Sequence, residues 1–152
     1  MTKLKSCTLI SGYFYYKKGA GTYTISSRVF PDEAKRQAIR QDNPCPGDRI
    51  VFTCIRNETP TVPIAVRWTA NGIPLYTFGI PRDIGTPRAN QDAGFPGLIG
   101  TLVDATMLTL LVDLTVSRDI SNGTEIVCDE VTSGITSPKF TLFITGKTHS
   151  GP

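Results

Sequence analysis

Apolar and polar residues alternate along much of the chain, as they do in strands that bury one face. The longest alternation runs through residues 108–117, with apolar residues at every even position and mostly polar residues at the odd ones. A second places Ile50, Phe52 and Cys54 on one face of a strand and Val51 and Thr53 on the other. The full set of expected strands after residue 40 is 49–55, 64–70, 75–78, 98–103, 108–117, 124–128 and 139–145.

Turn-forming residues separate these strands. Pro46-Gly47-Asp48 precedes the strand that begins at Arg49, and Asn71-Gly72 is a strong signal for a two-residue hairpin. Before residue 40 the pattern predicts a hairpin of 9–16 and 22–26, or alternatively an aromatic arm, and a short helix over 32–40. We therefore divide the chain into an N-terminal extension (1–39), an all-β domain (40–146) and a tail or linker (147–152).

Composition narrows the possible functions. The 152 residues suffice for one domain, and a formal net charge of +3 without any basic run does not suggest nucleic-acid binding. No run of 18 apolar residues is present, so we expect no membrane contact by this chain itself. The first residues are basic and mildly apolar, but they make an unconvincing signal peptide.

Few residues could support catalysis or metal binding. The only histidine, His149, lies in the expected tail, and the four cysteines lack the close spacing of zinc ligands. Asp129 and Glu130 are neighbours on a strand and point in opposite directions, so we expect solvated loop charges rather than a carboxylate pair. We accordingly expect no enzyme activity, no cofactor and no metal.

Three segments carry a family resemblance. PGDRIVFTC (46–54), VRWTANG (66–72) and LTVSRDISNGTEIVC (114–128) resemble the B, C and E–F strands of immunoglobulin-like (Ig-like) domains of animal cell-surface receptors. CPGD before the first strand, and NGTEIVC without the usual tyrosine before the cysteine, are similar to repeated Ig-like domains in surface proteins of early-branching animals. The resemblance covers residues 40–146 and implies a Greek-key β-sandwich of two antiparallel sheets.

The resemblance also implies how the cysteines are used. Cys54 and Cys128 would form a disulfide between the sheets, packed on the core Trp68, although two buried reduced thiols are the alternative. Cys7 could pair with Cys45 and tie down the extension; otherwise Cys45 is free or pairs outside the domain. The separation of 74 positions between Cys54 and Cys128 leaves room for extra strands, as in variable or intermediate types. No tyrosine holds the E–F corner, which leaves the backbone and Asn122 to do so.

Such domains recognise partners through a sheet face or through the loops at one end. In this sequence two sequons, at Asn57 and Asn122, fall in expected loops and suggest a glycoprotein outside the cell. An exposed apolar patch would mark a partner surface, unless the extension covers it. The expected partner face consists of Arg67, Thr69, Tyr76, Phe78, Val127, Asp129, Thr141 and Phe143.

These observations favour an extracellular recognition or adhesion module of a cell-surface or secreted receptor, binding a protein partner that could be a second copy of itself. The alternative is a carbohydrate-binding or spacer sandwich. Sugar binding would use a row of exposed aromatic residues, for which Tyr13, Tyr15, Tyr16 and Tyr23 are the candidates.

Overall fold

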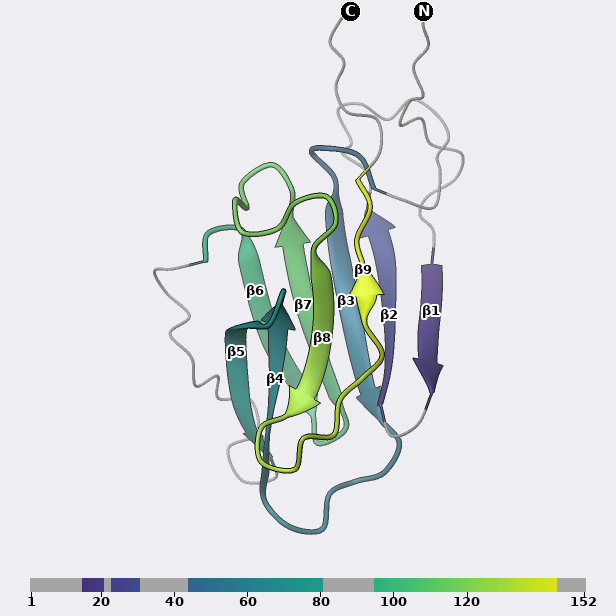
Figure 1. Cartoon of the computed structure of the whole chain (residues 1–152), viewed down its shortest axis with the longest axis vertical. Helices are drawn as coiled ribbons and strands as arrows, with labels where there is room; N and C mark the ends of the chain where they lie inside the picture. The colour runs from purple at the N-terminus through teal and green to yellow at the C-terminus, as the bar shows by residue number, and fades with distance from the viewer. Residues whose placement is uncertain (1–14, 21–22, 31–43, 81–94, 145–152) are drawn as a thin grey trace, which may run out of the picture.

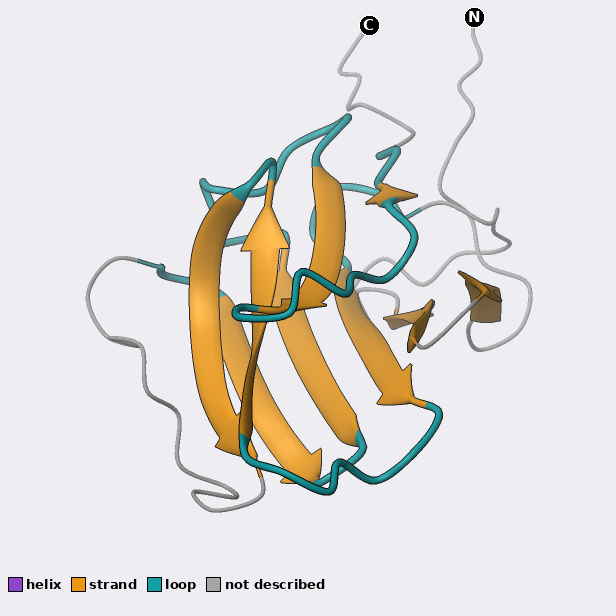
Figure 2. Cartoon of the chain, turned by 60° about the horizontal axis from the view of Figure 1, so that its bottom comes forward, coloured by secondary structure: helices purple, strands orange, loops and turns teal. Residues whose placement is uncertain are grey.

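The protein is an all-β sandwich of two antiparallel sheets (Figures 1 and 2). The computed structural model describes residues 15–20 (backbone only), 23–30, 44–80 and 95–144, and no helix occurs among them. The strands are β1 (Tyr15–Ala20), β2 (Tyr23–Phe30), β3 (Arg49–Arg56), β4 (Ile64–Ala70), β5 (Ile73–Ile80), β6 (Leu98–Asp104), β7 (Met107–Asp113), β8 (Glu125–Glu130) and β9 (Phe140–Thr141).

The strands divide between a five-stranded and a four-stranded sheet. The first sheet has the order β1-β2-β3-β7-β6, and the second has the order β5-β4-β8-β9. Figure 1 shows the second sheet in front of the first, with the β3–β4 and β8–β9 connections together at the lower end. We call this the loop end. Its position follows from the chain direction, because β3 and β8 both run toward it and β4 and β9 both leave it.

The core lies between the sheets and follows the alternation in the sequence. Ile50, Phe52 and Cys54 of β3 are 1%, 0% and 0% exposed, as the pattern predicts. Trp68 of β4 is also 0% exposed, and its ring lies 6.5 Å from that of Phe52. The disulfide between Cys54 and Cys128 is formed and joins the two sheets at this level. Two antiparallel sheets joined in this way fit an Ig-like sandwich.

The first sheet begins earlier than the sequence suggested. All eight residues of β2 pair with β3, and Tyr23 and Ile25 are both 0% exposed in the core. β1 adds an edge strand outside β2. The expected hairpin is therefore present, but Lys17 to Ala20 belong to β1 rather than to a turn, and β2 is a full strand of the sandwich rather than part of an extension. The short helix expected over 32–40 and the tail at 147–152 lie outside the described residues.

Two strands are shorter than expected. β7 ends at Asp113, where its backbone carbonyl accepts hydrogen bonds from the amides of Val116 and Ser117 in a turn. Val116, which the alternation placed in the strand, is 47% exposed. The last strand pairs with β8 only over Phe140–Thr141, although Leu142 still packs in the core at 2% exposure. Burial therefore continues past the regular pairing at β9, whereas after β7 the chain turns and Val116 faces solvent.

Candidate recognition surface

The outer face of the second sheet is the surface on which most of the expected contact residues meet. Its centre is a charged pair on adjacent strands: Arg67 of β4 lies directly opposite Asp129 of β8. The guanidinium donates two hydrogen bonds to the carboxylate, from Nε to Oδ1 at 2.8 Å and from Nη2 to Oδ2 at 3.4 Å. This hydrogen bonding raises the pKa of Arg67. We call this outer face the recognition face.

Residues of different chemistry surround this pair. Val127 is half-buried and lies on the same side of β8 as Asp129, since the alternate residues Ile126 and Cys128 are buried inward. Thr141 of β9 lies opposite Glu125 and is half-buried. Phe143, just past β9, is 52% exposed. The face therefore offers a charged pair, an aliphatic side chain, the Thr141 hydroxyl and one large aromatic ring.

For two residues the prediction that they lie on this face is wrong. Tyr76 and Phe78 of β5 are 4% and 0% exposed and point into the core, where their rings stack at 6.3 Å. The Tyr76 hydroxyl donates to the Leu98 carbonyl of the opposite sheet at 2.7 Å. Gly100 makes room for this ring, because a Cβ there would stand only 2.6 Å from the ring carbons. The inward orientation of β5 thus depends on a glycine in the other sheet.

Thr69 also differs from expectation. It was predicted to be exposed, but it is 3% exposed. The register of β4 against β5 shifts between Trp68 and Thr69, and Thr69 lies between Val127 on one side and Pro74 on the other. At this exposure Thr69 offers almost no surface to a partner.

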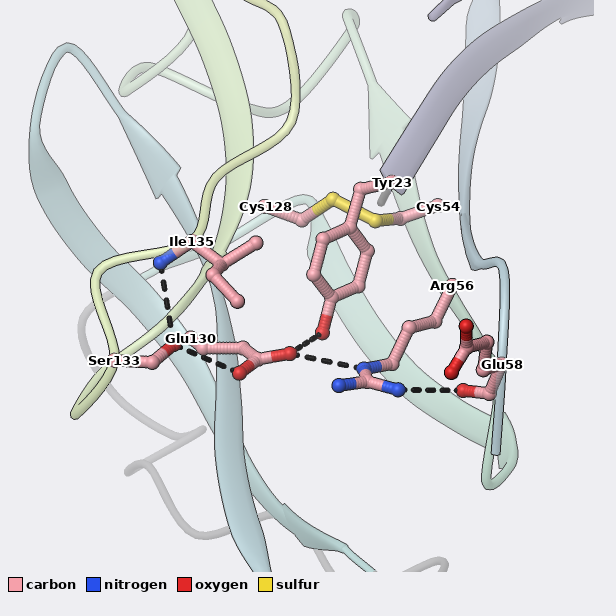
Figure 3. A network of polar contacts seen from close by, with 8 residues as sticks. All are labelled: Tyr23, Cys54, Arg56, Glu58, Cys128, Glu130, Ser133 and Ile135. Atoms are coloured by element: carbon pink, nitrogen blue, oxygen red, sulfur yellow. Dashed lines mark hydrogen bonds and ion pairs between the residues drawn. A yellow bond between two sulfur atoms is a disulfide. The ribbon is translucent and has the colours of Figure 1, made fainter. Parts of the chain in front are cut away.

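A buried polar network at the loop end, shown in Figure 3, was not predicted from the sequence. Glu130, at the end of β8, is 3% exposed and accepts hydrogen bonds from three side chains of other segments. These are the Tyr23 hydroxyl at 2.6 Å, Arg56 Nε at 2.9 Å and the Ser133 hydroxyl at 2.8 Å. Glu130 was expected to be a solvated loop charge, and this expectation is wrong.

Electrostatics in this network favour the ionised carboxylate and the neutral phenol. Burial pushes the pKa of Glu130 up, but the hydrogen bonds from Tyr23, Arg56 and Ser133 outweigh it, so that its pKa is lowered. Burial, together with the hydrogen bond to Glu130, raises the pKa of Tyr23 well above its usual value. The pKa of Arg56 is raised because its hydrogen bonds to Glu130 and Tyr23 outweigh its burial.

The network fixes the connection between β8 and β9. Ser133 accepts a hydrogen bond from the Ile135 amide at 3.2 Å while donating to Glu130. Backbone bonds add to this: the Glu130 amide donates to the Ile135 carbonyl at 2.8 Å, and the Val131 amide donates to the Ala65 carbonyl at 2.9 Å. Val131 and Ile135 remain 45% and 38% exposed. The loop end is therefore a second ordered surface with exposed aliphatic side chains.

Only one signal in the sequence could have indicated this network. Tyr23 was weighed as a sugar-stacking residue, yet its alternation with Ile25 is that of a core-facing strand. At 0% exposure Tyr23 is not available for stacking. Its partners lie 33 and 107 positions further along the chain (56 − 23 and 130 − 23), so that no local pattern brings them together. Tyr13 lies outside the described residues, and so do the side chains of Tyr15 and Tyr16.

The remaining candidate positions are compatible with their expected roles. Asn57 and Asn122 are both exposed. Asn122 also holds the corner before β8, because its Oδ1 accepts a hydrogen bond from the Ile144 amide at 2.7 Å. Cys45 is disulfide-bonded, whereas Cys7 lies outside the described residues, so their pairing stays a prediction. In the described ranges no cluster of acidic, cysteine or histidine side chains could hold a metal ion.

Comparison with other proteins adds no family assignment. No family model matches the chain, and no curated protein matches it. The class that the fold itself defines is an all-β sandwich with an inter-sheet disulfide, which fits an Ig-like sandwich. None of the described segments forms a helix long and apolar enough to cross a membrane.

Proposed function

We propose that this chain is an extracellular Ig-like recognition module of variable or intermediate type, part of a cell-surface or secreted receptor of animal origin, and that it binds a protein partner through the recognition face. The observation that carries the proposal is a composite surface on a rigid support. Phe143 and the Arg67–Asp129 pair lie outside a sandwich whose sheets are joined by a disulfide.

The chemistry of this face suits a protein better than a sugar. Aromatic and arginine side chains are enriched among the residues that dominate protein interfaces. Phe143 supplies an apolar anchor, and Arg67 and Asp129 offer charges that fix orientation while already satisfying each other in the free protein. Carbohydrate binding, the alternative function, would want several exposed aromatic rings, and Phe143 is the one large aromatic ring exposed among the side chains that the structure describes.

The disulfide and the two exposed sequons support the proposed extracellular location. Disulfides persist in oxidising compartments, and N-linked glycans are added to chains that enter the secretory route. Two bonded cysteines with 0% exposure and exposed Asn57 and Asn122 agree with both conditions.

A binding screen tests the proposal. The purified domain, multimerised to raise avidity, is applied to an array of cell-surface ectodomains and, in parallel, to a glycan array. We expect an ectodomain hit that Phe143→Asp removes and that Val116→Asp, a control at a similarly exposed site off this face, retains. Binding to glycans alone would favour the carbohydrate-binding alternative, and equal loss with both variants would remove the recognition face from the proposal.

A further inference from the structure

The outer face of the first sheet carries an unusual arrangement of side chains. Strand pairing aligns its outward residues into rows across β6, β7 and β3. Ile99, Leu111 and Val51 form one aliphatic row, and Thr101, Thr109 and Thr53 form a threonine row beside it. Beyond the threonines, Met107 lies opposite Ile55, and Val103 projects from the irregular end of β6. We call these nine residues the threonine face.

The face is open to solvent and contains no ionisable group. Ile99, Val103 and Ile55 are 56%, 48% and 37% exposed, and Thr101 is exposed as well. The other five side chains are half-buried by their neighbours in the sheet. Charges lie around the rim: Arg49 pairs with Asp113 at 3.7 Å beyond the first aliphatic row, Arg28 of β2 lies opposite Val51, and Asp104 lies opposite Met107. Contiguous exposed apolar patches rimmed by polar residues often mark interaction sites.

The pattern is chemically symmetric about Thr109. A half-turn around an axis through Thr109, perpendicular to the sheet, exchanges Ile99 with Ile55, Val51 with Val103, Leu111 with Met107, and Thr101 with Thr53. Each exchange replaces a residue by the same type or by one of similar volume. When two copies of this face meet across a twofold axis lying in the interface, threonine therefore meets threonine and aliphatic meets aliphatic, whether that axis runs along the strands or across them.

We propose that the threonine face is a homodimer interface, in which a second copy of this chain packs face to face around a twofold axis at Thr109. A twofold interface uses the same patch on both copies, so it requires a surface that is complementary to itself. An uncharged surface with matching rows meets this requirement, because no like charges approach and no charge loses its water. The proposal concerns the opposite sheet from the recognition face and does not depend on the proposed function.

The area predicts a weak dimer. Three strands about 4.8 Å apart and three rows about 6.8 Å apart give a footprint of about 300 Å². Stable interfaces bury about 800 Å² on each partner. The dimer should therefore form in a concentration-dependent way, as expected of a module that acts by avidity in arrays on a surface.

Sedimentation measurements on the full chain test the proposal. The average mass should rise from 16.5 kDa toward twice that value between about 10 μM and about 1 mM protein. Thr109→Lys should abolish the rise by placing two ammonium groups together at the axis. Val131→Lys, at a 45% exposed site in the β8–β9 connection and on neither face, is the control and should leave the rise unchanged. Raising the salt concentration should not weaken the dimer, because the face holds no charge.

A crosslinking experiment gives a readout that does not depend on stability. Thr109→Cys should form a disulfide-linked dimer under mild oxidation, because the twofold axis brings both copies of position 109 together. Val131→Cys should form none. A constant monomer mass up to about 1 mM, equal effects of the two lysine variants, or crosslinking at position 131 rather than 109 would each overturn the proposal. Failure here leaves the ectodomain screen unaffected, since that screen uses the other sheet.

Discussion

The hydroxyl of Tyr23 offers the sharpest test of how the two sheets are held together. It donates to the carboxylate of Glu130 across the sandwich at 2.6 Å, and both residues are nearly inaccessible to water. Tyr23→Phe removes this one oxygen and keeps the ring in its place in the core. Glu130 then keeps its bonds from Arg56 and Ser133 but loses a third donor that water cannot replace.

The magnitude follows from the charge of the acceptor. A hydrogen bond to a charged group contributes about 1.5–3 kcal/mol, whereas a neutral pair contributes about 0.5–1.5 kcal/mol. Tyr76→Phe is the matched control, because the Tyr76 hydroxyl donates to a neutral carbonyl, that of Leu98. We expect Tyr23→Phe to lower the free energy of unfolding by about 2 kcal/mol and to cost more than Tyr76→Phe.

Urea denaturation provides the assay, followed by far-UV circular dichroism and by the fluorescence of Trp68, the only tryptophan. The midpoint should fall while the slope stays constant, because the variant exposes the same surface on unfolding. A Tyr23→Phe variant within about 0.5 kcal/mol of the parent, or one less affected than Tyr76→Phe, would refute the view that this network stabilises the fold.

Two further predictions follow from the same contacts. The lowered pKa of Glu130 stabilises the fold at neutral pH, and this stability is lost as the pH falls below the ordinary pKa of a carboxyl group and through the lower pKa of the folded state. Glu130→Gln should therefore be less stable than the parent at pH 7 and should lose less stability on acidification. Thermal unfolding from pH 7 to pH 3 measures both. Gly100→Ala should cost about 1–3 kcal/mol in urea denaturation, because its Cβ would meet the Tyr76 ring. A Cβ at Gly72 would meet no atom within 4 Å, so Gly72→Ala costs only the strain of alanine at a positive φ of 81°. A greater loss of stability for Gly72→Ala than for Gly100→Ala would contradict this account.

The central strands could be predicted from the sequence because their signals are local. Alternation placed Phe52 and Cys54 on the buried side of β3, and Asn71-Gly72 marked the hairpin between β4 and β5, where Asn71 has the positive φ that such turns require. The bond between Cys54 and Cys128 came from the family resemblance and is present.

The failures involve contacts between residues far apart in the sequence. Tyr76 points inward because Gly100, 24 positions further along the chain (100 − 76), leaves space for its ring in the other sheet. Glu130 is buried because Tyr23 and Arg56 supply donors from the first sheet. A polar residue at the end of a strand predicts solvent unless its distant partners are known, and a single sequence does not reveal them. The outward orientation of Arg67, Asp129 and Phe143 was therefore predicted, whereas the inward orientation of Tyr76 and the loop-end network were not.

Three side-chain hydrogen bonds that join the two sheets come from different parts of the chain. The Tyr76 hydroxyl donates to the Leu98 carbonyl, the Trp68 indole donates to the Thr109 carbonyl at 3.1 Å, and the Tyr23 hydroxyl donates to Glu130 at the loop end. Sliding or rotating one layer against the other would break several of these bonds at once. The domain should therefore move as a rigid body when it is pulled or when a partner binds, and it should transmit force without internal bending.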